Sequence, residues 1–105
     1  MNKFNVVTNV MLDLKMEFDD GFEFIREAVI MVIDSPLITA TKHIYPTLSK
    51  KYGISANAVE RCVRTSTEKT IRKNNIDRMT NLYFVRFLAN KARMILSEEE
   101  VEENV

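Results

Sequence analysis

The chain has 105 residues, of which 46% are hydrophobic, and its formal net charge at pH 7 is zero. This length accommodates one domain with a modest core. With only two glycines and two prolines, we expect an all-α fold rather than a multistranded sheet. No apolar run approaches the roughly 18 residues of a membrane span, and the amino terminus lacks the apolar core of a signal peptide. The single cysteine, Cys62, cannot form an internal disulfide, which fits a reducing compartment. We therefore expect a cytoplasmic protein with no membrane contact.

The charged residues are distributed unevenly along the chain. Residues 42–93 contain twelve Lys and Arg against three Asp and Glu, a net charge of +9, whereas residues 1–41 contain three against seven. The segment 97–105 adds five glutamates. A strongly basic segment is typical of a nucleic-acid-binding surface. The alternative is a solvated basic face that binds no nucleic acid.

Apolar periodicity predicts about six helices within a single domain spanning residues 1–96. The first two helices are expected at about 6–14 and 22–33. Ser35 is expected to cap a third helix with Pro36 at its first position, since these residue types favour the start of a helix.

The centre of the chain predicts a short basic helix followed by a longer one. Tyr45 and Pro46 either bend the chain or start the short helix, because a residue before proline avoids helical geometry. Gly53 provides a turn, and Ser55 is expected to cap the long helix, which covers residues 56–73.

The carboxyl-terminal part predicts two more helices and a tail. Asn74 and Asn75 are expected to end the long helix, with a short helix at 77–83 and a last helix at 84–96. The acidic run 97–105 is expected to be a disordered tail. The alternative is that this run folds over the basic surface and competes with DNA.

The long helix separates into an apolar and a polar face. Its polar face carries Asn57, Glu60, Arg61 and Arg64. The long helix follows a short helix and a tight turn, which is the layout of a helix-turn-helix, and in such motifs the second helix enters the major groove of DNA. The inward positions, at steps of three and four residues, are Ala56, Val59, Cys62, Val63, Ser66, Thr70 and Ile71.

These polar side chains can distinguish base pairs. Arg61 and Arg64 can each donate two hydrogen bonds to O6 and N7 of a guanine, so the target is expected to contain G·C pairs. Glu60 can accept from a cytosine amino group or orient a neighbouring arginine, and Asn57 can pair with adenine or contact a phosphate. The alternative is that Glu60 and Arg64 form only a surface ion pair at i,i+4.

Five motifs resemble the C-terminal effector domain of the stage-zero sporulation response regulator family, whose members are master transcription factors of endospore-forming bacteria. The resemblance covers roughly residues 7–83 and, after a gap, the last helix at 84–96. It implies a six-helix DNA-binding domain and a duplex DNA partner with a box similar to TGTCGAA, often in tandem copies. The motifs are GFEFIREAV at 21–29, TKHIYP at 41–46, SKKY at 49–52, VERCVR at 59–64 and NIDRMTNL at 75–82.

The resemblance also implies roles for individual residues. The base-reading positions of the family fall on Glu60, Arg61 and Arg64, and Asn57 stands at a position near the DNA backbone. The expected phosphate contacts are Lys50, Lys51, Ser55 and Thr65.

The sequence departs from the family pattern in three ways. Ala58 and Thr65 replace an arginine and a histidine common in the family, which is expected to weaken affinity or alter specificity. The phosphorylatable receiver domain is not in this chain, which is either a complete protein without such control or a fragment. The family's long loop, next to surfaces linked with RNA polymerase and dimer contacts, is absent between Tyr83 and Phe84.

The sequence does not predict an enzyme. It has no Gly-rich phosphate loop, no nucleophile–base pattern and no metal-ligand cluster around its only histidine, His43, so we expect neither cofactor nor metal. A competing role is a protein-interaction module that forms a homodimer or binds a full-length regulator. In that role the apolar residues of the last helix would mediate self-association if they were exposed; they are Phe84, Phe87, Leu88, Met94 and Ile95.

Overall fold

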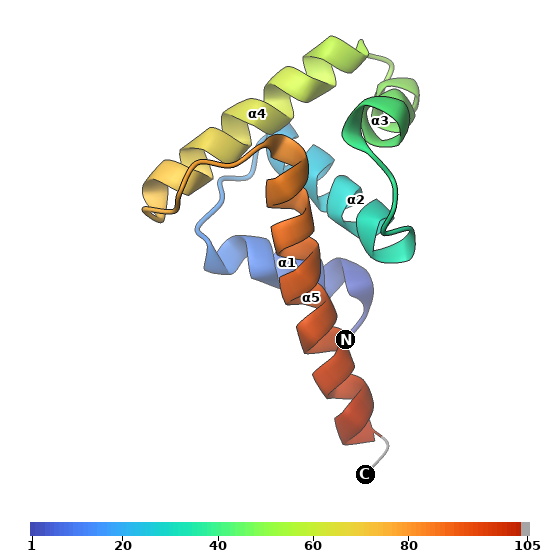
Figure 1. Cartoon of the computed structure of the whole chain (residues 1–105), viewed down its shortest axis with the longest axis vertical. Coiled ribbons are helices and arrows are strands. Elements are labelled where there is room, and N and C mark those ends of the chain that lie inside the picture. Colours follow the sequence, from blue (N-terminus) through green and yellow to red (C-terminus); the bar gives the residue numbers. More distant parts are fainter. Residues whose placement is uncertain (104–105) are drawn as a thin grey trace.

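The computed structural model describes residues 1–103, with side chains described through Glu99. This part of the chain is all-helical and has no strand, and Figure 1 shows its five α-helices. A single π-helical turn accompanies them, so the predicted count of six helices is not confirmed. The elements are α1 (Lys3–Asp13), α2 (Asp20–Asp34), the π-helical turn (Ala40–Ile44), α3 (Tyr45–Tyr52), α4 (Ala56–Lys73) and α5 (Asn81–Glu103).

Helix α2 is the centre of the fold. It packs against α1, α4 and α5, while α3 packs against α4. The buried apolar side chains come from all five helices, and their removal from water is the main stabilising contribution. The largest fully buried side chains are Phe22, Phe84, Met11, Ile25, Ile44, Leu48 and Leu88.

The crossing of α2 over α4 depends on a glycine. A Cβ atom at Gly21 would lie 2.2 Å from Ser66 Oγ and 2.6 Å from the carbonyl oxygen of Cys62. Asp19 caps α2 by accepting from the Phe22 N–H at 2.9 Å, and its Oδ1 also accepts from Ser66 Oγ at 3.0 Å. The start of α2 is therefore fixed directly on the middle of α4.

The predicted helix after Ser35 is wrong. Ser35 ends α2 as its C-cap, and Pro36 and Leu37 lie in a turn in which the Leu37 side chain is 92% exposed. Thr39 instead caps the π-helical turn Ala40–Ile44. The backbone N–H of Ser35 still bonds to a carbonyl of α2, so this serine completes one helix and does not begin the next.

The predicted short helix at 77–83 is also wrong. Residues 76–80 form no helix, and α5 begins at Asn81 as one continuous helix. Thr80 determines this start, because its Oγ1 accepts from the Tyr83 N–H at 3.2 Å. A threonine before the first turn is a favoured helix cap.

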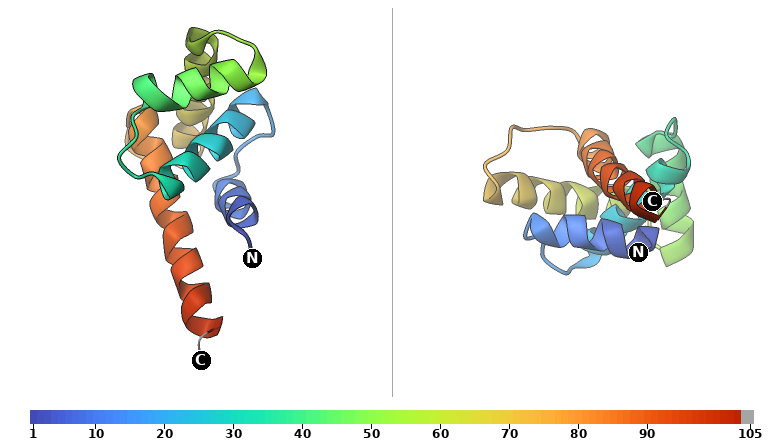
Figure 2. Two further views of the ribbon diagram at one scale, coloured as in Figure 1. Left: turned by 90° about the vertical axis from the view of Figure 1, so that its right-hand side faces the viewer. Right: turned by 90° about the horizontal axis from the view of Figure 1, so that it is seen from below.

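Helix α5 also continues past the predicted domain end at residue 96. The acidic run expected to be a disordered tail is helical as far as Glu103, and residues 104–105 lie outside the described part of the chain. Two perpendicular views show this half of α5 extending beyond the other helices (Figures 1 and 2). Within the described residues, neither α5 nor any other helix combines the length and apolar content needed to cross a membrane.

Candidate nucleic-acid interface

The turn between α3 and α4 has the predicted local structure. Pro46 lies in the first turn of α3, and the helix ends at Gly53, whose φ of 68° is in the left-handed region that glycine adopts without strain. Ser55 caps α4, with its Oγ accepting from the Ala58 N–H at 3.0 Å. Only three residues separate the helices, so the first turn of α4 lies beside the basic end of α3.

The two faces of α4 follow the predicted pattern. Asn57, Arg61, Arg64 and Thr65 are exposed, and Glu60 is half-buried. The predicted inward positions are all buried at least in part. Five of them are buried, which are Val59, Val63, Ser66, Thr70 and Ile71, and two are partly buried, which are Ala56 and Cys62.

Glu60 and Arg64 form an ion pair at the edge of the exposed face. Arg64 Nη1 lies 3.1 Å from both carboxylate oxygens of Glu60, and the two side chains are 50% and 32% exposed. This is the i,i+4 ion pair that the spacing of the two residues allows, and the role of Glu60 in orienting Arg64 toward a base stays a prediction. An exposed pair of this kind contributes little stability, so its main consequence is the direction of the guanidinium.

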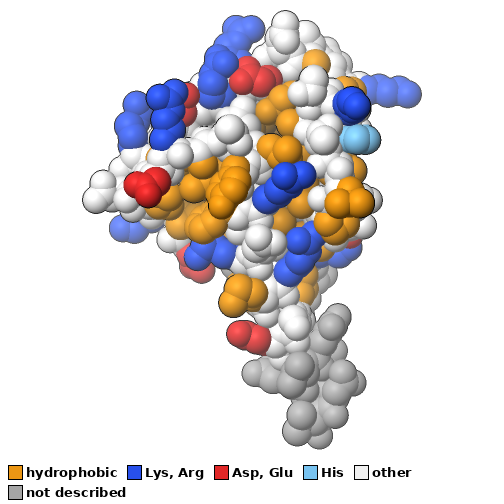
Figure 3. All heavy atoms as spheres, viewed as in Figure 1, with side chains coloured by type: hydrophobic (Ala, Val, Ile, Leu, Met, Phe, Trp, Pro, Cys, Tyr) orange, Lys and Arg blue, Asp and Glu red, His pale blue; other side chains and the backbone are white. Residues whose placement is uncertain are grey.

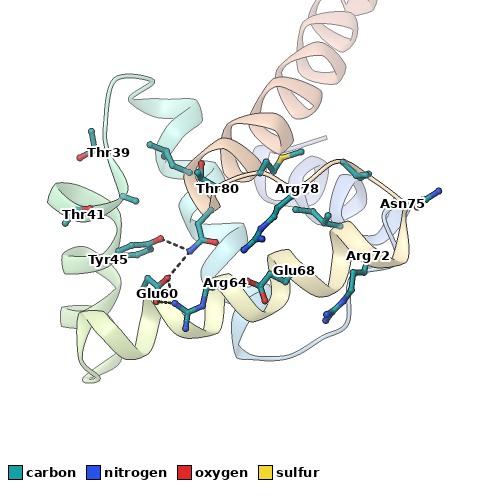
Figure 4. Close-up of a pocket in the computed structure, with 16 residues that line it drawn as sticks. Thr39, Thr41, Tyr45, Glu60, Arg64, Glu68, Arg72, Asn75, Arg78 and Thr80 are labelled. Carbon is teal, nitrogen blue, oxygen red and sulfur yellow. Dashed lines mark hydrogen bonds and ion pairs between the residues drawn. The ribbon is translucent and has the colours of Figure 1, made fainter.

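Two residues outside α4, Tyr45 and Asn81, complete this arrangement, and Figure 4 shows Tyr45 beside Glu60. Asn81 Nδ2 lies 3.1 Å from the Tyr45 hydroxyl and 3.5 Å from Glu60 Oε1. Partial burial raises the pKa of Tyr45, against the opposing effect of the hydrogen bond from Asn81. Sequence reasoning missed both residues, because Asn81 is remote from α4 in sequence and only tertiary packing brings it to Glu60.

The predicted phosphate contacts on α3 differ in their surroundings. Lys50 is exposed and forms no ion pair among the described residues. Lys51 donates to the carboxylate of Glu27 on α2, which also accepts from the Tyr52 hydroxyl. This hydrogen bond to a carboxylate raises the pKa of Tyr52 to about 12. Lys51 is thus held by α2, whereas Lys50 extends freely.

The basic residues of α4 are also divided between two surroundings. Near the end of α4, Lys69 lies 3.4 Å from Glu17 and 3.8 Å from Asp19, and Lys73 lies 3.7 Å from Glu17. Acidic residues of the segment 1–41 therefore neutralise part of the positive charge of the segment 42–93. Arg61, near the start of α4, has no such partner in the described part of the chain. Figure 3 shows Lys and Arg side chains gathered over α4.

An open groove of about 1140 Å³ lies beside the ion pair (Figure 4). Its walls are α4, the π-helical turn and the segment before α5. The groove combines apolar side chains with Glu60, Glu68 and three arginines, which are Arg64, Arg72 and Arg78. Among the described residues, no group of three or more His, Cys, Asp or Glu could hold a metal ion.

Two of the apolar residues expected to mediate self-association, Phe84 and Leu88, are not available for it. Phe84 and Leu88 are fully buried in the core, and Phe87 is partly buried with its ring stacked near that of Phe84. The condition for self-association through Phe84 and Leu88 is therefore not met. Met94 and Ile95, further along α5, are 65% and 36% exposed.

A basic helix, a tight turn and a second helix with exposed amide and guanidinium groups define a small helical domain of the kind that binds nucleic acid. Comparison with known protein families identifies the family to which this domain belongs. Residues 7–98 match the family described as "Sporulation initiation factor Spo0A C terminal", and the chain belongs to this family. This family is a DNA-binding effector domain of sporulation transcription regulation, and it is not an enzyme family. The resemblance predicted from the sequence motifs is confirmed.

Proposed function

We propose that this domain binds duplex DNA sequence-specifically and thereby regulates transcription, with α3 and α4 as a helix-turn-helix and α4 as the base-reading helix. The observation that carries the proposal is the exposed row of Asn57, Arg61 and Arg64 along the first three turns of α4. A recognition helix reads bases from its amino-terminal part, and this is where the row begins.

The proposed base contacts follow from the side-chain surroundings. Arg61 has both edges of its guanidinium free of protein partners in the described chain, so it suits bidentate donation to guanine O6 and N7. Arg64 is held by Glu60 through Nη1 only, which leaves its other donors for a second base. Asn57, in the first turn, would contact adenine or the backbone. The target is a box with G·C pairs similar to TGTCGAA.

The proposed phosphate contacts surround this row. Lys50 extends from the last turn of α3, and Lys51 is directed by Glu27. The Ser55 hydroxyl accepts from the α4 backbone and keeps its own proton to donate to a phosphate oxygen. Thr65 is the fourth contact, on the exposed face of α4. A contact with RNA polymerase stays a prediction of the family resemblance.

Self-association is a second candidate function, favoured by one observation. Met94 and Ile95, in the carboxyl-terminal half of α5, are 65% and 36% exposed. A homodimer, or a complex with a full-length regulator, would use these residues in place of the buried Phe84 and Leu88.

Substitution of the two arginines tests the DNA-reading proposal. Arg61→Ala and Arg64→Ala should each weaken binding to a TGTCGAA duplex by about 1–3 kcal/mol, with a smaller effect on a scrambled duplex. Arg72→Ala is the matched control. It removes the same charge from the last turn of α4, about 16 Å along the helix from Arg61 at roughly 1.5 Å per residue. Equal losses for all three variants on both duplexes would refute base reading by α4.

A further inference from the structure

Asn81 occupies a junction between three elements of the structure. It is the first residue of α5, and its side-chain nitrogen faces Tyr45 at the start of α3 and Glu60 on α4, at 3.1 and 3.5 Å. Glu60 in turn receives Arg64 Nη1 at 3.1 Å on both oxygens. Figure 4 labels Tyr45, Glu60 and Arg64, which lie close together at one end of the groove.

The chemistry of the partners determines how the amide is oriented. An ionised carboxylate only accepts hydrogen bonds, so Asn81 must present its NH₂ group to Glu60. The two amide hydrogens then bridge the Tyr45 hydroxyl and the carboxylate. The Glu60 contact is at the outer limit of hydrogen-bond distance, and the stronger contact to Tyr45 keeps the amide in place.

This arrangement leaves Arg64 partly occupied. Its Nη1 is engaged by Glu60, whereas Nη2 and Nε have no protein partner in the described part of the chain. A guanidinium carries five donors in a fixed plane, so the Nη2–Nε edge can still donate two parallel hydrogen bonds. The position of Glu60 determines which way that edge faces.

We propose that Asn81 is a positioning residue for base recognition: it fixes the carboxylate of Glu60 on α4 and, through that carboxylate, directs the free edge of Arg64 toward a base pair. The effect of Asn81 on base recognition rests on the proposed function of α4 as the base-reading helix. Fixing the guanidinium before binding reduces the side-chain freedom that is lost in the complex. The same contact ties the start of α5 to the base-reading face.

The test compares Asn81→Ala with Thr80→Ala, its neighbour. Thr80 caps α5 without contacting Glu60, so its substitution reports a purely structural weakening of the same helix end. The probes are a TGTCGAA duplex and versions in which one G·C pair at a time is replaced by A·T. Asn81→Ala should reduce the preference for the intact box by about three- to tenfold and leave the salt dependence unchanged. Thr80→Ala should leave the preference intact.

A double variant and a measurement without DNA complete the test. In a Glu60→Ala background, Asn81→Ala should cause no further loss of preference, because its route to Arg64 is already removed. In the free protein, ¹⁵N relaxation of Arg64 Nε should show a restrained side chain that becomes mobile in Asn81→Ala and stays restrained in Thr80→Ala.

The outcomes separate this inference from the proposed function. A wild-type protein that prefers no duplex would overturn base reading, and Arg64 relaxation would still decide the role of Asn81. Unchanged relaxation in Asn81→Ala, a loss of preference equal to that of Thr80→Ala, or additive losses with Glu60→Ala would each overturn the positioning role.

Discussion

Replacing Gly21 by alanine tests how α4 is held in place. The added Cβ would lie 2.2 Å from Ser66 Oγ, 2.8 Å from Ser66 Cβ and 2.6 Å from the carbonyl oxygen of Cys62. A hydroxyl can rotate away, but the carbonyl belongs to the α4 backbone and can move only with the helix. The substitution therefore forces α2 and α4 apart at their crossing.

The expected cost has two parts. Overpacking of a close contact costs about 1–3 kcal/mol. Rotation of Ser66 also breaks its 3.0 Å hydrogen bond to Asp19, and a typical hydrogen bond contributes about 0.5–1.5 kcal/mol. We expect Gly21→Ala to lower the free energy of unfolding by about 2–4 kcal/mol, a large share of the roughly 5–15 kcal/mol of a small domain.

Urea unfolding followed by circular dichroism at the helix band measures this cost. Ser66→Gly in the Gly21→Ala background removes two of the three close atoms, so it should recover part of the stability relative to its own single-variant control. Gly53→Ala is a contrasting control, because its Cβ would meet nothing within 4 Å and only its φ of 68° opposes the change, at about 1–2 kcal/mol. A loss below about 0.5 kcal/mol for Gly21→Ala, the size of an ordinary surface change, would refute the proposed close contact.

Three further predictions concern the surface of α3 and α4. Lys50→Ala should weaken binding to all duplexes alike and reduce the slope of log affinity against log salt by about 1; a loss confined to the box would contradict a phosphate role. Ser55→Ala should lower the free energy of unfolding by about 0.5–2 kcal/mol through loss of the α4 cap, measured by urea unfolding; no change would mean that its Oγ does not stabilise the helix. The pKa of Tyr52 is raised from 10.0 to about 12 by its bond to Glu27. When the pKa of a group is higher in the folded than in the unfolded protein, the protonated group stabilises the fold fully at pH below the unfolded-state pKa. This stabilisation is lost as the pH rises through the folded-state pKa. The free energy of unfolding should therefore fall between about pH 10 and 12, and less so in Tyr52→Phe; equal slopes for both proteins would refute the bond.

The sequence predicted α4 correctly because every local signal agrees there. Ser55 has the side chain of a helix cap, Gly53 suits a left-handed turn, and one continuous apolar face buries the helix. Consistent local preferences of this kind leave one structure favoured. The bounds 56–73 expected from the sequence are those of the helix.

The region around Ser35 was predicted wrongly because its local signals are ambiguous. A serine before a proline suits the start of a helix, but it also suits the end of one, and the buried face of α2 continues to Val32. The choice depends on the packing of α2, which local preference does not contain. The second error, a helix beginning at residue 77, arose because the capping of α5 by Thr80 could not be read from the sequence pattern.

The candidate site was predicted on α4 but not around it. Glu60, Arg61 and Arg64 were identified because helical spacing puts them on an exposed face. The contact of Asn81 with Glu60 depends on how α5 packs against α4, and no helical periodicity relates two residues on different helices. Similarly, Phe84 and Leu88 follow helical spacing, yet the packing of α5 against α1 and α2 determines that they are buried.

The most direct test of the central claim is a titration of the wild-type protein with a labelled TGTCGAA duplex and a scrambled duplex at several salt concentrations. Sequence-specific recognition predicts tighter binding to the box and a preference that persists as salt rises, because base contacts depend less on counterion release than phosphate contacts do. Equal and strongly salt-sensitive binding to both duplexes would contradict base reading and leave only a phosphate-binding surface. No binding to either duplex would contradict the DNA-binding account itself and favour self-association through α5.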